Sequence, residues 1–232
     1  MSSTTTPAVT PRRDGDPEVD LTAYYLVHRA MLADTRTVAD LADLVAGGTV
    51  LLSADRASAL RDYVGALCRE IHSHHAAEDD IVWPVVAASA GSAVDLSGLT
   101  DDHAVVDPLL GRARTAATAL ATAPDDLGAA CGLAGAMTEL LALLNEHIGD
   151  EERDVFPVIR RFVSVADYDA AEQRLRHGIG VSHLRWVLPW LAHHATSEEM
   201  AVLLARAGLP VRVLLAASRP GFRRTRREVF GS

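Results

Sequence analysis

The chain has 232 residues, of which 49% are hydrophobic and 23% charged, proportions that are ordinary for a soluble globular protein. Its 22 basic and 31 acidic residues leave a formal charge of −9, which makes nucleic acid a poor partner for the molecule as a whole. The two cysteines, Cys68 and Cys131, form no CxxC pair, so we expect neither a disulfide framework nor a thiolate metal site. A reducing, cytoplasmic location fits this cysteine usage best.

Residues 1–19 lack the apolar stretch of a signal peptide and are predicted to form a disordered arm. We expect no run that is apolar over the length needed to cross a bilayer, and therefore no membrane partner. Residues 20–163 are predicted to form one helical domain, and residues 164–232 a helical extension packed on it.

Four long segments have apolar residues at three- and four-residue spacing, which predicts amphipathic helices. The first begins near Asp20, a good N-cap, and ends at Gly47-Gly48. The others cover about 53–89, 100–122 and 125–162. Because the connections are short, successive helices are expected to be antiparallel neighbours. The predicted fold class is therefore all-α, an up-down-up-down four-helix bundle.

The extension begins with an amphipathic stretch, "SVADYDAAEQRLRHG", and continues as shorter helical pieces. These pieces are expected to break at the following glycines and prolines: Gly178, Gly180, Pro189, Gly208, Pro210 and Pro220.

An internal repeat links the second and fourth predicted helices. The segment "HHAAEDDIVWPVV" (74–86) aligns without gaps with "HIGDEERDVFPVI" (147–159). In both copies a histidine is followed by acids at +4 and +5, an aromatic residue at +9 and a proline at +10. The first and third helices echo the pattern with His28 and His103. The order along the chain is His, HxxxE, His, HxxxE, with one element on each helix.

This spacing has a direct chemical meaning. Helical residues four apart lie about 40° apart around the axis, so an HxxxE pair presents an imidazole and a carboxylate to the same point. Two such helices, with one histidine from each of the others, would give two metal ions four nitrogens and two bridging carboxylates. A set of nitrogen and oxygen ligands with open positions suits iron, and less uniquely manganese or zinc. The predicted metal ligands are His28, His74, Glu78, His103, His147 and Glu151.

The surroundings of these residues favour a metal site over isolated core histidines. The helical neighbours of His74 and His147 are otherwise almost all apolar. A histidine and a glutamate placed on such a stripe cost several kcal/mol unless they are paired or bound to metal.

The other two histidines of "HSHHAAEDDIVWP" are expected on the outside of the helix. His72 lies about 200° from His74 and should face away from the centre. His75 lies about 100° from His74, beside Asp79, so we expect it at the rim as a surface residue. The alternative for His75 is a role in orienting a ligand histidine.

The chain resembles the hemerythrin-like family, also called the HHE cation-binding domain, over roughly residues 20–162. The resemblance is carried by His28, "HAAEDDIVWP" from His74, His103 and "HIGDEERDVFP" from His147. It implies a non-haem diiron centre, bridged by oxygen and by Glu78 and Glu151. Such a centre binds dioxygen or reacts with nitric oxide or peroxide.

One position departs from the family's oxygen carriers, which have a second histidine on the third helix, four residues after the first. Here that position is Asp107. It could ligate metal, hydrogen-bond a bound ligand or face solvent, and these alternatives stay open. A carboxylate there would favour oxidised irons, and so redox chemistry or sensing over reversible oxygen carriage. Tyr24 and Tyr25 could donate a hydrogen bond into the site, although core packing is the simpler interpretation.

We therefore expect a diiron protein that binds and redox-processes O2, NO or H2O2, with two oxo- or hydroxo-bridged irons as its cofactor and no catalytic group beyond the metal ligands. The first alternative is a diiron oxygenase or oxidase that acts on an organic substrate in a cavity partly built by the extension. The second is an iron- or oxygen-responsive sensor or interaction protein, in which metal binding alters a partner surface.

Overall fold

The structure is a computed structural model and describes residues 7–231. Within these residues all regular secondary structure is helical, which confirms the all-α prediction. The first part of the chain forms α1 (Thr22–Ala46), α2 (Ala54–Ala77), η1 (Glu78–Val82), α3 (Trp83–Ala90), η2 (Gly91–Ala93), α4 (Ser97–Thr122), α5 (Leu127–Asp150), η3 (Glu151–Val155) and α6 (Phe156–Phe162). The rest forms α7 (Val165–Gly178), α8 (Val181–His194), α9 (Ser197–Arg206) and α10 (Leu209–Phe230).

Side-chain caps explain where several helices begin. Ser53 accepts a hydrogen bond from the backbone of Arg56 at the start of α2, and Asp126 accepts one from Ala129 at the start of α5. At the start of α1, Asp20 accepts from the backbone N–H of Thr22 at 3.0 Å.

Two of the predicted long helices contain a wider turn at the same place in the repeat. A π-turn, η1, separates α2 from α3, and a second, η3, separates α5 from α6. Each starts at the glutamate of an HxxxE pair, and each ends just before the aromatic residue that precedes Pro84 or Pro157. Proline lacks an N–H and clashes with the carbonyl four residues earlier, so the local widening accommodates it. The two prolines of the repeat are therefore each accompanied by a π-turn.

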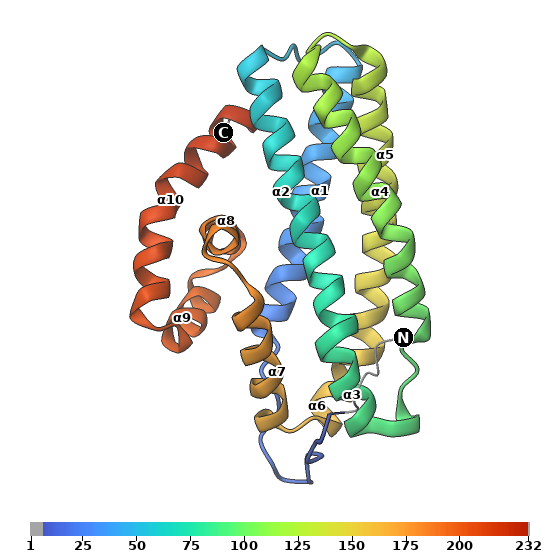
Figure 1. The fold of residues 1–232 in the computed structure, drawn as a ribbon, viewed down its shortest axis with the longest axis vertical. Coiled ribbons are helices and arrows are strands. Elements are labelled where there is room, and N and C mark those ends of the chain that lie inside the picture. The colour runs from blue at the N-terminus through green and yellow to red at the C-terminus, as the bar shows by residue number, and fades with distance from the viewer. Residues whose placement is uncertain (1–6, 232) are drawn as a thin grey trace.

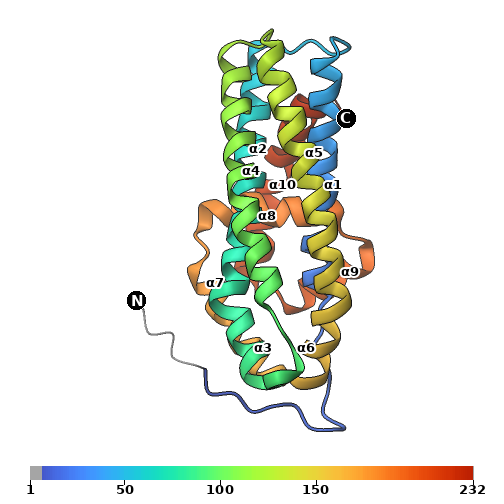
Figure 2. The same cartoon turned by 90° about the vertical axis from the view of Figure 1, so that its right-hand side faces the viewer.

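The four long helices α1, α2, α4 and α5 lie side by side (Figures 1 and 2). α1 packs along α5, α5 along α4, and α4 along α2. In contrast, α1 and α2 make few contacts with each other, although they are consecutive in the chain. The expectation that all successive helices are close neighbours is thus not met for this pair.

The extension lies on the side where α1 and α2 are exposed (Figure 1). α8 packs on α1, α10 packs on α2 and α8, and α7 lies against η1 and α3. Pro189 and Pro220 lie inside α8 and α10, so the prediction that they break the helices is wrong. The amphipathic stretch predicted at residues 164–178 does form a helix, α7.

A buried carboxylate on α1, Asp34, holds the extension in place. Trp190 of α8 donates its indole N–H to Asp34 at 2.8 Å, and Arg226 of α10 pairs with it at 2.8 Å. His194 lies 3.1 Å from the same carboxylate, and Tyr63 of α2 donates its hydroxyl to it. Four elements therefore meet at one fully buried acid.

The chain before α1 also has defined contacts. The backbone N–H of Thr10 donates to Asp167 at 2.9 Å, and that of Arg12 donates to the carbonyl of Phe162 at 2.9 Å. Residues 7–19, expected to be disordered, thus lie against the end of the domain and α7. Residues 1–6 of the predicted arm lie outside the described residues.

One stretch, Leu127–Phe162, is long and apolar enough to cross a membrane by length and composition. The expectation that no such run exists is therefore wrong. The stretch comprises α5, η3 and α6, and α5 packs along both α1 and α4. A helix in the core of a protein is also long and apolar, so length and composition alone do not distinguish it from a membrane-spanning helix.

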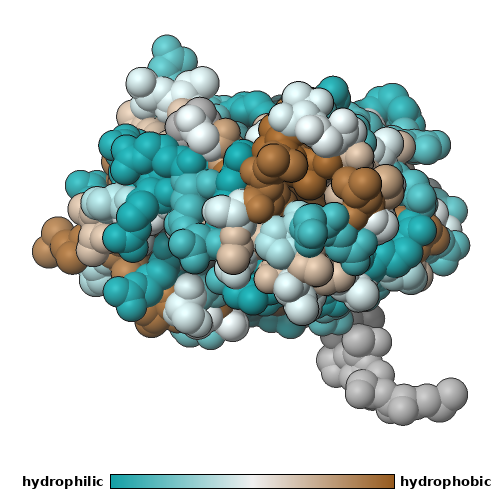
Figure 3. All heavy atoms as spheres, turned by 90° about the horizontal axis from the view of Figure 1, so that it is seen from above, coloured by the Kyte–Doolittle hydropathy of each residue, from teal (hydrophilic) through white to brown (hydrophobic). Residues whose placement is uncertain are grey.

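The surface seen from the end that carries the α1–α2 and α4–α5 connections is mostly polar, with limited hydrophobic patches (Figure 3). Two leucines at this end are largely exposed: Leu51, in the α1–α2 connection, and Leu127, the first residue of α5.

Candidate metal centre

The predicted ligands come together near the end of the molecule that carries α3 and α6 (Figure 1). α1 and α4 contribute residues from near their starts, whereas the second and fourth helical stretches contribute residues around their π-turns. Two apolar clusters enclose this region. One includes Met31, Ile71 and Ile148, and the other includes Val82 and Phe156. All six predicted ligands belong to one of two groups of side chains that could hold a metal ion.

A first group of potential ligand atoms comes from four elements, α1, α2, η1 and η3: His28, His74, Glu78 and Glu151. One ligand atom from each lies within 4.8 Å of the others. The Nε2 atoms of His28 and His74 are 3.1 Å apart, and His74 Nε2 is 2.8 Å from Glu78 Oε1. His28 Nε2 is 3.3 Å from Glu151 Oε2. Two imidazoles and two carboxylates therefore face one point.

A second group shares Glu78 with the first and adds three histidines: His75, His103 and His147. The Nε2 atoms of His103 and His147 are 3.2 Å apart, and His103 Nε2 is 3.4 Å from Glu78 Oε2. The two oxygens of Glu78 thus face different groups, as a bridging carboxylate would.

His75 is buried, with 4% of its surface exposed, so its predicted position at the rim is wrong. Its ring stacks on that of His103 with centroids 4.3 Å apart. The buried face of α2 is wide, because Leu67, Cys68 and Ile71 are all buried. Residue 75 is four residues after Ile71 and three before Glu78, so it points inward beside His74. The apolar Cys68, seven residues before His75, is the signal that could have shown this.

His72 behaves as predicted and is exposed, with 60% of its side chain accessible. Its Nδ1 atom lies 2.8 Å from Asp107, whose side chain is 56% exposed. Asp107 thus faces solvent and pairs with His72, away from both groups. Its exposure contradicts the ligand and pocket alternatives for that residue.

The donor set fits a metal, because its polar atoms lack other partners. Eight buried side-chain nitrogen and oxygen atoms have no hydrogen-bond partner within residues 7–231, and five of them belong to this cluster. They are Nε2 of His75, Oε2 of Glu78, Nδ1 of His147 and both carboxylate oxygens of Glu151. Burial without a partner costs about 1–3 kcal/mol for a polar group and more for a charge. A bound cation would satisfy most of these atoms.

The electrostatics of His75, His147 and Glu78 suit ligation as well. Burial and the neighbouring His74 lower the pKa of His75 to about 2, so its imidazole is neutral and can bind metal. Burial also lowers the pKa of His147. Burial would raise the pKa of Glu78, but the surrounding histidines outweigh it and hold the pKa well below its usual range. Burial and the charge of Glu78 raise the pKa of Glu151.

Outer carboxylates hold His28 and His103 by their other nitrogen, and a third lies near His147. His28 Nδ1 is 2.9 Å from Glu152, His103 Nδ1 is 2.9 Å from Asp79, and His147 Nδ1 is 3.5 Å from Asp102. Carboxylates in such positions set the tautomer and ring orientation of metal-binding histidines. These roles were not predicted from the sequence, although the acid at +5 of the repeat is Asp79 in one copy and Glu152 in the other.

A family model described as "Hemerythrin HHE cation binding domain" matches residues 20–159. The chain belongs to the hemerythrin family. This confirms the resemblance drawn from the histidine and glutamate pattern. No curated protein and no solved structure matches the chain. α7 to α10 lie beyond the matched residues.

The two tyrosines at the start of the hemerythrin domain differ in position. Tyr24 is buried and donates its hydroxyl to Glu78 Oε1 at 2.6 Å. Burial and the nearby Glu151 and Glu78 raise its pKa well above the usual range, so it keeps its proton. Tyr25 instead packs edge-on against Phe156, with ring centroids 4.8 Å apart.

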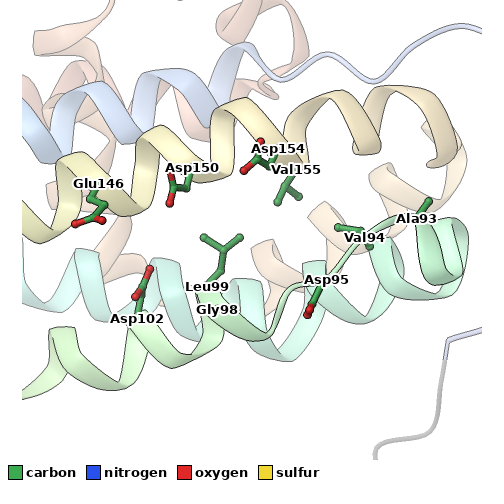
Figure 4. A pocket seen from close by; sticks show the side chains of 10 residues that line it. All are labelled: Ala93, Val94, Asp95, Gly98, Leu99, Asp102, Glu146, Asp150, Asp154 and Val155. Atoms are coloured by element: carbon green, nitrogen blue, oxygen red, sulfur yellow. The ribbon is translucent and has the colours of Figure 1, made fainter.

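Two pockets lie on different sides of the hemerythrin domain. One, of about 490 Å³, lies between the start of α4 and α5 and η3. Figure 4 shows the carboxylates that line it: Asp95, Asp102, Glu146, Asp150 and Asp154. The other, of about 150 Å³, is mostly apolar and is bounded by α1, α2, η1 and α7. His74, Glu78 and Tyr24 form part of its lining.

Proposed function

We propose that this hemerythrin-family protein holds two iron ions and uses them to bind and redox-process a small ligand, O2, NO or H2O2. The observation that carries the proposal is the pair of buried ligand groups that share Glu78. Two groups that converge on the two oxygens of one carboxylate fit a pair of ions better than a single ion. Manganese and zinc accept similar ligands and rank behind iron.

In this proposal His28 and His74 would hold one ion, and His75, His103 and His147 would hold the other. Glu78 and Glu151 would contribute their carboxylates to the pair. When bound, a pair of ferrous ions supplies the two electrons that, with two protons, convert H2O2 to two water molecules. His75 adds a fifth imidazole to the four that the sequence pattern indicates.

The chain's own residues prepare the site. Tyr24 holds its proton at Oη and donates it in a hydrogen bond to Glu78, which orients that carboxylate. Glu152, Asp79 and Asp102 orient the histidines from outside. The apolar clusters on both sides keep bulk water from the buried ligands, which strengthens every charge interaction among them.

The size of the apolar pocket supports a small ligand over an organic substrate. Its volume of about 150 Å³ is below the roughly 300–1,000 Å³ that is usual for organic ligands. An oxygenase or oxidase with an organic substrate is the second candidate, because α7 of the extension lines this pocket. A sensor in which metal binding changes a partner surface would instead give a large iron-dependent change in protease resistance or oligomeric state.

We also propose that the four long helices are the up-down-up-down bundle expected from the sequence, and that the protein works in the cytoplasm without a nucleic-acid or membrane partner. The net charge of −9 and the two free cysteines support this.

The deciding experiment is metal analysis and an optical spectrum of protein grown with iron. About two irons per chain and charge-transfer bands of an oxo-bridged pair are expected. Fewer than about one metal per chain, with no change on Glu78→Ala and Glu151→Ala, would contradict the proposal. Exposure of the reduced protein to O2, H2O2 and NO in turn then identifies the ligand. Turnover that requires an added organic substrate would favour the oxygenase.

A further inference from the structure

The candidate centre has one side that the four long helices leave open. α1 and α2 touch little, and α7, from beyond the matched domain, lies against η1 and α3 on this side (Figure 1). The pocket of about 150 Å³ lies between these elements. From α7 it is lined by Tyr168, Ala171, Glu172 and Leu175.

We propose that α7 forms the outer wall of the ligand-access pocket and restricts it to small, uncharged ligands. The inference rests on the proposed function, because the inner wall of the pocket contains His74 and Glu78, two of the proposed metal ligands. It adds an assignment for the extension: α7 determines which molecules reach the centre.

The lining explains the restriction to uncharged ligands. Besides His74, the only polar side chains are Tyr24, Tyr168 and the two glutamates, Glu78 and Glu172. The Tyr24 hydroxyl is already donated to Glu78. Glu172 lies at the wall, 27% exposed and 3.4 Å from Arg176. An anion entering between apolar walls would lose its hydration and face two carboxylates, whereas a neutral molecule would not.

The larger pocket, of about 490 Å³, is acidic, in contrast to the apolar pocket beside α7. Its five carboxylates make it unsuitable for anions and unattractive to apolar molecules (Figure 4). Apolar molecules such as O2 and NO partition favourably into the apolar pocket instead. The two pockets therefore differ in what they admit. The α7 side suits O2 and NO, and H2O2 can enter it as a small uncharged molecule.

Two neighbouring alanines on α7 give a matched pair of variants. Ala171 is buried, with 4% of its surface exposed, and lines the pocket. Ala170 is exposed on the outer face of the same helix. Ala171→Trp should fill the pocket, whereas Ala170→Trp adds the same side chain in solvent. Leu175→Ala should widen the pocket.

The first test uses metal-free protein and so does not depend on activity. Ala77, on the inner wall, is replaced by cysteine in a Cys131→Ser background, while the native Cys68 is buried. The cysteine is treated with neutral methyl methanethiosulfonate or with its anionic sulfonatoethyl analogue. We expect the anion to react roughly tenfold slower, because it loses hydration between the apolar walls and approaches the carboxylates of Glu78 and Glu172. Ala171→Trp should slow the reaction of this cysteine with both reagents, and Leu175→Ala should accelerate it. Ala170→Trp should leave both rates unchanged.

The second test uses reduced, iron-loaded protein and compares H2O2 with tert-butyl hydroperoxide by stopped-flow spectroscopy. Wild type should strongly prefer H2O2, Leu175→Ala should narrow this preference, and Ala171→Trp should slow both oxidants. Equal effects of Ala170→Trp and Ala171→Trp in both tests would overturn the proposal while leaving the iron site intact. If Ala171→Trp does not fold, an unchanged preference in Leu175→Ala is the overturning result. Absence of iron would contradict the proposed function, and the thiol test would still decide the role of α7.

Discussion

The ring of His75 stacks on that of His103, with centroids 4.3 Å apart and planes 10° apart. The two histidines come from α2 and α4, and the stack places the Nε2 atom of His75 next to the group formed with Glu78 and His147. A buried imidazole with an unpartnered Nε2 atom costs about 1–3 kcal/mol, and a bound partner would remove this cost. The second metal ion of the proposed pair provides such a partner.

His75→Ala is therefore expected to weaken metal binding by at least roughly tenfold, the smallest loss usual for outer partners alone. His72→Ala is the matched control, since His72 is three residues earlier on α2 and exposed. Competition with a chromophoric chelator measures both affinities. Equal affinities in the two variants would show that His75 is only a packing residue.

The outer carboxylates should matter nearly as much as a ligand. Asp79→Asn and Glu152→Gln keep the side-chain shape but remove the charge that orients His103 and His28. We expect about a 10- to 100-fold loss of iron affinity in each. Asp80→Asn serves as control, because Asp80 is exposed beside Asp79. If all three variants bind iron like wild type, the carboxylates have no orienting role.

Asp34→Asn should loosen the extension. It removes the charge that pairs with Arg226 and weakens the acceptor for Trp190 and Tyr63. Because it leaves the partly buried guanidinium of Arg226 without its charged partner, we expect a loss of about 3 kcal/mol in the free energy of unfolding. Urea unfolding followed by tryptophan fluorescence measures this, and limited proteolysis reports release of α8 to α10. Asp40→Asn, at an exposed position of α1, should change neither.

The carboxylate of Asp34 also makes the free energy of unfolding depend on pH. Burial would raise the pKa of Asp34, but the hydrogen bond and charge of His194, with Arg226, outweigh it and lower the pKa to about 2. A carboxyl group whose pKa is lower in the folded state stabilises the fold fully above its unfolded value of 3.8, and this contribution is lost as pH falls towards about 2. The difference in unfolding free energy between wild type and Asp34→Asn should therefore be constant from pH 7 to about 5 and shrink below about 4. A difference that stays constant down to pH 2 would contradict the assignment.

Much of this protein follows from local patterns in its sequence. Apolar spacing at three and four residues depends only on helix geometry, so it predicted the long helices to within a few residues at most ends. The gapless repeat likewise identified His74 and His147 as equivalent positions, and the hemerythrin family match agrees with it. Both signals lie within single helices, where spacing along the chain determines which side chains share a face.

Only the tertiary structure decided the features that depend on partners distant in the chain. His75 points inward because the buried face of α2 is wide enough for two histidines, and its stacking partner, His103, comes from α4. Nothing in the sequence around Asp34 distinguishes it from other acids on α1. Its role depends on Trp190 of α8 and Arg226 of α10, which contact it only in the folded chain. The opening between α1 and α2, and the placement of α7 across it, also arise from packing between elements. Helical periodicity specifies one face of one helix, whereas the partner of that face is selected by shape, charge and buried hydrogen bonds over the whole chain.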